Sequence, residues 1–263
     1  MVRVGTLNLA SGRGADGLGL DGDGLHVALV GVDADVLAVQ EVDAGQPRSH
    51  GVDQPAAVAR ALRAVDWRAA ATLTGTPGPT RDWQPVDPPV LRGPGQPVDS
   101  PQYGIALVSR VPVLDWRVLA LGGGRARLPV QAPDPRTGKA RWWWVPDEPR
   151  VAIAAQLAGL TVVTAHLSFS PPTALRQLLR LRRWTASLPG PVLVAGDLNL
   201  PGRLPAATLG GVPLVRTATY PGAAPRLQLD HLIALGDVRP AGAAVSRQLT
   251  VGDHRLLVAP VTG

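Results

Sequence analysis

The chain has 263 residues, of which 45% are hydrophobic, so it is long and apolar enough to bury a sizeable core. It contains no cysteine, which excludes disulfides, thiolate metal sites and cysteine nucleophiles. The formal net charge is +6, which a polyanionic partner would explain. A coding bias toward arginine would explain it as well, because Lys139 is the only lysine.

The sequence shows no apolar run that is long enough to span a bilayer. Residues 1–10 also lack the charged and apolar segments of a signal peptide. We therefore expect a cytoplasmic protein, and we expect it to be a monomer.

The N-terminal part of the chain predicts strands that alternate with helices. Alternating apolar residues predict a strand that begins at residue 2 and ends near Asn8. After a loop rich in Gly and Asp, the pattern predicts a helix, a strand, a helix and a strand over residues 25–34, 35–43, 53–65 and 67–74.

Two long segments predict irregular, substrate-facing loops, residues 76–101, which are rich in proline, and residues 122–149. Around them, residues 103–121 predict a strand, a turn and a strand, and residues 151–168 predict a hairpin that turns at Gly159. The remaining pattern predicts a helix and three strands over residues 172–188, 191–199, 227–236 and 254–261. Many apolar strands with few helices favour one domain of the α/β (α+β) class, in which two sheets pack face to face with helices outside.

Polar side chains stand at the ends or beginnings of six predicted strands. They are Asn8, Glu41, His166, the pair Asp197 and Asn199, the pair Asp230 and His231, and the pair Asp253 and His254. In an antiparallel sheet the end of one strand lies beside the start of the next, so all six places could meet at one rim. Carboxylate and amide oxygens suit Mg²⁺, Mn²⁺ or Ca²⁺ better than Zn²⁺. Such a metal neutralises charge on a phosphoryl group, and an Asp beside a His orients the ring.

Each of these positions also has a structural interpretation. Asn8 and Glu41 alone are typical strand-end residues, and Asp197 with Asn199 is typical of a turn. His166 follows an apolar strand and His231 lies within an apolar run, so each is typical of a buried structural histidine. The functional interpretation depends on the ordered set.

The segments TLN, QE, YGIALVSRVPV, TAHL, GDLN, QLDHLIAL and GDH occur in the order that is seen in the endonuclease/exonuclease/phosphatase superfamily. The chain resembles this group from Asn8 to His254. The group includes deoxyribonuclease I, exonuclease III-like abasic-site endonucleases, sphingomyelinases and inositol-polyphosphate 5-phosphatases. The resemblance implies a four-layer α/β/β/α sandwich of two mainly antiparallel sheets flanked by helices. It also implies Mg²⁺-dependent hydrolysis of a phosphoester bond by water, with Mn²⁺ as an alternative metal.

The resemblance further implies a metal site. Glu41 looks like the main metal ligand, with Asn8 and Asp253 close to the metal. Two residues depart from the family's common pattern, Ala165 where Thr is frequent and Gly252 where Ser is common. Neither change removes a catalytic group, so both concern the fine geometry alone.

The catalytic roles follow from the same resemblance. His254 looks like the catalytic histidine that pairs with Asp230 and acts as general base or as a phosphate-stabilising group. Asp197 looks like the residue that positions or activates the attacking water. Asn199 and His166 look like phosphate contacts in the transition state.

The substrate-binding prediction concerns residues 122–149, where Trp142, Trp143 and Trp144 stand beside Arg141 and Arg150. Aromatic and arginine side chains can stack on bases and hold phosphates. The same tryptophans could instead enter a membrane interface and reach a lipid headgroup, or pack on the core. The arginines of the helix at 172–188 could form a basic face for nucleic acid or a solvated helix face; they are Arg176, Arg180, Arg182 and Arg183.

Three functions are therefore open. The first is a metal-dependent phosphodiesterase that acts on nucleic acid. The second is a phosphatase or phosphodiesterase that acts on a phospholipid, a phosphoinositide or a small phosphorylated molecule. The third is a binding module that has kept the fold without catalysis. The complete set of acidic, amide and histidine positions argues against the third, because binding alone does not need all of them.

Overall fold

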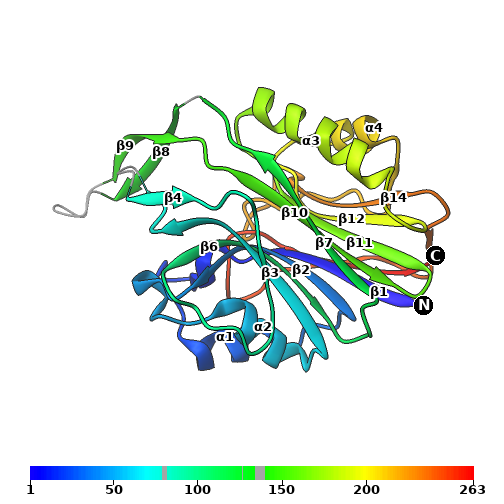
Figure 1. Ribbon diagram of the computed structural model, residues 1–263, viewed down its shortest axis with the longest axis horizontal. Helices are drawn as coiled ribbons and strands as arrows, with labels where there is room; N and C mark the ends of the chain where they lie inside the picture. Colours follow the sequence, from blue (N-terminus) through cyan, green and yellow to red (C-terminus); the bar gives the residue numbers. More distant parts are fainter. Residues whose placement is uncertain (79–81, 126, 134–139) are drawn as a thin grey trace.

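In the computed structural model, which describes residues 1–78, 82–125, 127–133 and 140–263, two β-sheets pack face to face (Figure 1). The first sheet has the order β15-β17-β1-β2-β6-β3-β4, with β16 on β17 and β5 on β3. Its strands are β1 (Val2–Asn8), β2 (Val36–Ala44), β3 (Asp66–Gly75), β4 (Trp83–Pro85), β5 (Leu91–Arg92), β6 (Gln102–Ser109), β15 (Arg239–Pro240), β16 (Val245–Arg247) and β17 (Leu256–Thr262).

The second sheet has the order β13-β14-β12-β11-β10-β7. Its strands are β7 (Asp115–Gly122), β10 (Arg150–Leu157), β11 (Leu160–His166), β12 (Val192–Asp197), β13 (Val212–Pro213) and β14 (Asp230–Leu235). A separate hairpin, β8 (Arg127–Pro133) and β9 (Ala140–Pro146), projects beyond the sheets at the left of Figure 1.

Helices cover the outer face of each sheet, which completes the four layers that the sequence predicts (Figure 1). Helices α1 (Gly22–Leu29) and α2 (Gln54–Leu62) pack on the first sheet, and α3 (Pro171–Thr185) and α4 (Leu204–Leu209) pack on the second. The start of α2 agrees with its sequence, because the Asp53 carboxylate accepts a hydrogen bond from the Ala56 N–H and Pro55 lies in the first turn. No described helix is both long and apolar enough to cross a membrane.

The central layer between the sheets explains why their strands are apolar on both faces. Val36 and Ile105 of the first sheet lie in one buried cluster with Ile153, Val162 and Leu193 of the second. Helices bury the opposite faces, so apolar residues predominate along most of each strand. Polar residues can occur where a strand ends, which is where the polar positions of the sequence lie.

We expect Val162→Ala to lower the free energy of unfolding by about 2 kcal/mol, because it removes two methyl groups from a fully buried site. Val245→Ala makes the same deletion on edge strand β16, where the side chain is 54% exposed, and should cost far less. Urea unfolding of both variants would measure the difference. Equal losses would contradict the assignment of Val162 to the core.

The structure corrects several sequence-based expectations. Residues 122–149 are not irregular throughout, because they contain the hairpin β8–β9, and residues 76–101 contain the short strands β4 and β5. Residues 103–121 form two strands as predicted, but β6 and β7 belong to different sheets, so the turn between them carries the chain from one sheet to the other. Helix α4 and the short strands β13, β15 and β16 were not predicted. Residues 79–81, 126 and 134–139, among them Lys139, lie outside the described part of the chain.

Candidate active site

Three strands of the second sheet bring polar side chains into one row. Strand β11 runs parallel to β12 with His166 opposite Asp197, and β14 runs antiparallel to β12 with Asp230 opposite Asp197. Opposite residues in neighbouring strands present their side chains on the same face. The sequence argument assumed antiparallel neighbours, but β11 and β12 are parallel, and their carboxyl ends meet directly.

The first sheet contributes Asn8 and Glu41 through another parallel pair, β1 and β2. The pairing of β2 with β6 shifts between Gln40 and Val42, so Glu41 is the extra residue of a β-bulge. Its φ is +53°, a left-handed conformation that non-glycine residues seldom adopt. Bulges re-aim side chains, and backbone strain of this kind concentrates at functional sites.

Asn8 joins the two sheets at this point. Its side-chain amide donates hydrogen bonds of 3.0 Å to Oε1 of Glu41 and of 3.0 Å to Oδ2 of Asp197. Its own Oδ1 accepts from the Ala10 N–H at 3.0 Å, which fixes the orientation of the amide. One buried amide therefore holds two carboxylates near each other, one from each sheet.

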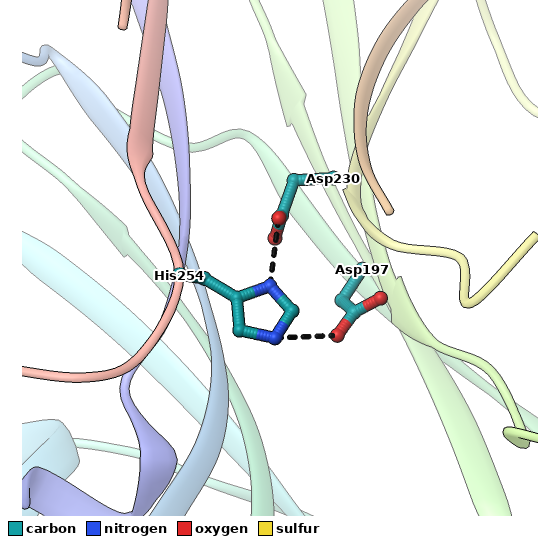
Figure 2. A group of neighbouring side chains, drawn as sticks. All are labelled: Asp197, Asp230 and His254. Atoms are coloured by element: carbon teal, nitrogen blue, oxygen red, sulfur yellow. Dashed lines mark hydrogen bonds and ion pairs between the residues drawn. The ribbon is translucent and has the colours of Figure 1, made fainter. Parts of the chain in front are cut away.

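Asp230, His254 and Asp197 form a chain of side chains (Figure 2). The Nδ1–H of His254 donates to Oδ2 of Asp230 at 2.8 Å, and Nε2 lies 3.8 Å from Oδ2 of Asp197. Burial disfavours the imidazolium, but the hydrogen bond and charge of Asp230, with the charges of Asp197 and Asp253, outweigh burial and raise the pKa of His254 to about 10. His254 is therefore a cation near neutral pH.

The environment of Asp197 opposes its ionisation. Burial and the charge of Asp230 outweigh the charge of His254 and the bond from Asn8, and the pKa of Asp197 rises to about 7. A carboxyl group with such a pKa can accept a proton near neutral pH.

His166 lies on the other side of the same carboxylate. Its Nε2 is 3.7 Å from Oδ2 of Asp197 and 4.0 Å from Oε1 of Glu41. Burial, with the charges of Arg150 and His254, lowers its pKa well below the ordinary value. The two histidines at the site are therefore in opposite charge states.

Asp253 and Asn199 complete the set of predicted residues. Oδ1 of Asp253 lies 4.0 Å from Nε2 of His254, and the Asp253 side chain is 56% exposed. Gly252 before it has φ +75°, and a Cβ there would lie 2.6 Å from the carbonyl oxygen of Asn8, so the family's common Ser would not fit this backbone. The backbone N–H of Asn199 donates to Oδ1 of Asp197, and its side-chain amide donates to the carbonyl of Leu167.

All these groups except the buried Asn8 and Asp230 line one cleft of about 590 Å³. The cleft also contains both tyrosines of the chain, Tyr103 and Tyr220, and its only phenylalanine, Phe169. The Tyr220 ring lies 4.8 Å from the ring of His254. Five residues of the cleft wall were not predicted from the sequence: Tyr220, Phe169, Arg13, Arg48 and Glu148. The rarity of Tyr and Phe in this chain was a signal that could have indicated the two aromatic residues.

The tryptophan run divides between two faces of β9. Trp143 lines the cleft, and the guanidinium of Arg141 lies 4.6 Å from the centre of its ring. Trp142 and Trp144 point to the other face and are 64% and 62% exposed, so they do not pack on the core. Arg150 also lines the cleft, but it is buried. The four arginines of α3 are exposed and outside the cleft wall, as in a solvated helix face.

His231 is placed as a structural residue, because its ring is buried and Nε2 lies 3.0 Å from the Leu200 carbonyl oxygen. Burial lowers its pKa in the folded chain. Below pH ~6.5, the unfolded chain therefore binds a proton that the buried ring resists, and stability decreases as the pH falls. We expect His231→Gln, which does not titrate, to lose less stability than the native protein between pH 7.5 and 5.5. Equal losses in urea unfolding at the two pH values would contradict this.

The donor set fits a hard divalent cation. Asp197, Asp230 and His254 have ligand atoms within 4.8 Å of one another, but Nδ1 of His254 is already hydrogen-bonded to Asp230. Glu41 and Asp253 add two carboxylates to the same cleft. Carboxylate oxygen donors suit Mg²⁺ or Mn²⁺.

Comparisons with known proteins identify the family of the chain and relate its fold to solved structures. The family model described as Endonuclease/Exonuclease/phosphatase family matches residues 5–254. No curated protein sequence matches the chain. Solved structures with a similar fold include an endonuclease/exonuclease/phosphatase from Beutenbergia cavernae DSM 12333, with 19% identity and a TM-score of 0.66 over 99% of this chain and 71% of that one. They also include the mannosyl-6-phosphatase Bt3783 from Bacteroides thetaiotaomicron VPI-5482, with 11% identity and a TM-score of 0.60 over 100% of each chain. A humanized D. rerio TDP2 has 15% identity and a TM-score of 0.57 over 100% of this chain and 99% of that one. Because the family match spans nearly the whole chain, this protein belongs to the Endonuclease/Exonuclease/phosphatase family.

Proposed function

We propose that this protein is a divalent-metal-dependent phosphodiesterase that cleaves nucleic acid by water attack on phosphorus. The family is one of hydrolases that act on phosphoester bonds. The observation that carries the proposal is the buried group Asp230–His254–Asp197 (Figure 2). His254 and Asp197 line a cleft together with Glu41 and Asp253. This site combines the His254 cation, the Asp197 carboxyl group of raised pKa, and the carboxylate oxygens of Glu41 and Asp253 that could bind a metal.

In the proposed reaction, a water oxygen forms a bond to phosphorus while the ester P–O bond breaks. Asp197 orients this water and accepts its proton, which its raised pKa favours. His254, oriented by Asp230, stabilises the negative charge of the phosphoryl oxygens. The raised pKa of His254 supports this role over that of general base, because the cation has no free lone pair to accept a proton. The departing oxygen leaves with a proton from the solvent.

Glu41 and Asp253, with Asn8 behind them, would hold Mg²⁺ or Mn²⁺. Such an ion neutralises charge that develops on the transferred phosphoryl group. The bulge and the bonds of Asn8 give Glu41 a defined orientation before any ion binds. His166 and Asn199 are proposed to contact the remaining phosphoryl oxygens.

The chemistry of the cleft favours a nucleic acid. Arg13 and Arg48 line it together with Tyr103, Tyr220 and Trp143, which provides cations for a backbone and aromatic faces for bases. The net charge of +6 has the matching sign. A small phosphorylated molecule is the second candidate, because a cleft of about 590 Å³ falls in the usual size range for small ligands.

A substrate panel with Mg²⁺ or Mn²⁺ would test the proposal. It would contain plasmid DNA, an abasic-site duplex, single-stranded RNA, sphingomyelin, a phosphoinositide, a sugar phosphate and an aryl phosphodiester, each also with EDTA. We expect EDTA-sensitive cleavage of DNA or RNA, with apparent affinity that decreases steeply as salt rises. Cleavage of the sugar phosphate alone would replace the nuclease proposal with the second candidate, an enzyme that acts on a small phosphorylated molecule. Cleavage of a lipid alone would replace it with a lipid phosphodiesterase.

We expect Glu41→Gln to raise the Mg²⁺ concentration for half-maximal activity about tenfold or more, because it removes the charge of the proposed main ligand. Asp237→Asn, an exposed carboxylate outside the cleft, is the matched control and should leave the Mg²⁺ dependence unchanged. Titrating Mg²⁺ at fixed substrate concentration measures both. An unchanged Mg²⁺ dependence of Glu41→Gln would remove Glu41 from the metal site.

A further inference from the structure

The Nε2 atoms of His166 and His254 approach the same carboxylate oxygen, but the Nδ1 atoms of the two rings contact side chains of opposite charge. Their Nε2 atoms lie 3.7 and 3.8 Å from Oδ2 of Asp197. Behind His254, Nδ1 is bonded to the carboxylate of Asp230, which can only accept. Behind His166, Nδ1 lies 3.0 Å from a guanidinium nitrogen of Arg150. The identity of the residue behind each ring therefore distinguishes the two histidines.

The Arg150 contact determines where His166 carries its proton. A guanidinium has five N–H donors and no acceptor, and it stays protonated in proteins. The hydrogen bond therefore requires an unprotonated Nδ1 on His166, which leaves the single ring proton on Nε2. That atom faces the carboxylates of Asp197 and Glu41.

The fold holds Arg150 in this position. It is the first residue of β10, which pairs with β11 so that Ala152 lies opposite Ala165, and the start of β10 therefore adjoins His166 at the end of β11. Only 3% of the Arg150 side chain is exposed, and its guanidinium lies 3.7 Å from Oε2 of Glu148. A buried cation with such partners has little freedom to turn away from the ring.

We propose that Arg150 is a positioning residue, which holds His166 as the neutral tautomer with its proton on Nε2 and directs that proton at a phosphoryl oxygen of the substrate. His166 then supplies one neutral hydrogen-bond donor beside Nε2 of His254, at the same carboxylate of Asp197. The part that concerns substrate rests on the proposed phosphoester hydrolysis, whereas the tautomer of His166 is a property of the protein alone.

Long-range ¹H–¹⁵N NMR spectra of protein with ¹⁵N-labelled histidine, recorded with and without Mg²⁺, would test the tautomer. We expect His166 to show the pattern of a neutral ring with the proton on Nε2. In Arg150→Met, which cannot donate, we expect this pattern to give way to exchange between tautomers or to a charged ring. Arg92→Met is the matched control, because Arg92 is a mostly buried arginine paired with Asp53 outside this cleft. A proton on Nδ1 in the native protein, or an unchanged His166 signal in Arg150→Met, would overturn the proposal.

Kinetics would test the consequence for catalysis, using the substrate that the panel identifies. We expect Arg150→Met to lower kcat about tenfold with little change in KM, and Arg150→Lys, which can still donate, to recover part of the loss. In a His166→Ala background, Arg150→Met should have no further effect on kcat. An equal effect in both backgrounds, or an effect on KM alone, would show that Arg150 contacts substrate directly. If no substrate is cleaved, the proposed function fails while the NMR result still decides the role of Arg150.

Discussion

Asp197→Asn is expected to reduce hydrolysis about 100-fold or more and, at the same time, to raise the melting temperature of the metal-free protein at pH 8. The rate falls because an amide cannot accept the proton of the attacking water. Stability rises because the native carboxylate is buried beside the charge of Asp230, where its ionised form is disfavoured. Active sites commonly retain such costly groups because function needs them.

The sign of the pH dependence follows from the raised pKa. Asp197 titrates near pH 7 in the folded chain and about 3.9 when unfolded, so its contribution to stability is complete below about pH 4 and is lost as the pH rises through 7. The stability advantage of Asp197→Asn should therefore be largest at pH 8 and should vanish near pH 4. Thermal or urea unfolding in EDTA at several pH values would measure this difference.

Asp35→Asn provides a control of opposite sign. Burial opposes ionisation of Asp35, but hydrogen bonds from Arg3 outweigh burial and lower its pKa. Loss of this carboxylate should therefore destabilise the protein at pH 8, and the cost should persist down to about pH 4 and decrease only below it. A destabilising effect of Asp197→Asn at pH 8 would contradict a buried carboxylate whose ionised form is disfavoured. Retained activity of the same variant would contradict the catalytic role of Asp197.

His254→Ala is expected to lower kcat/KM by about 100-fold to 10,000-fold, the range for loss of one positioned catalytic group. The variant loses the ring that is hydrogen-bonded to Oδ2 of Asp230, and it leaves a buried carboxylate whose Oδ1 has no hydrogen-bond partner in the described part of the chain. We therefore also expect a lower melting temperature. Single-turnover rates with saturating Mg²⁺ would separate chemistry from binding.

His50→Ala is the matched histidine control, because His50 is exposed and lies outside the cleft. Its hydrolysis rate should equal that of the native protein. Activity that survives His254→Ala with a folded protein would show that the cation at position 254 is not part of the reaction. Circular dichroism of each variant would establish that the fold is retained.

The sequence predicts most of the fold because its local signals are strong. The strands ending at Asn8 and His166 are apolar runs that stop at polar residues, and α2 begins with an Asp and a Pro as helices do. The hairpin β8–β9 was not predicted because its segment is rich in Pro, Gly and Arg, and its stability depends on pairing that no single stretch reveals.

The sequence by itself determined which chemical groups are available and that they stand at strand ends, because the middle of a strand that is buried on both faces favours apolar side chains. Only the tertiary structure decided which groups meet. The parallel pair β11–β12 places His166 beside Asp197, and the bulge in β2 turns Glu41 toward Asn8. The charge states of His166 and His254 were also decided there. Burial and the charge of Arg150 lower the pKa of His166, whereas Asp230, from another strand, outweighs burial at His254 and raises its pKa. A residue's type is local, whereas its proton affinity depends on the charges that folding places around it.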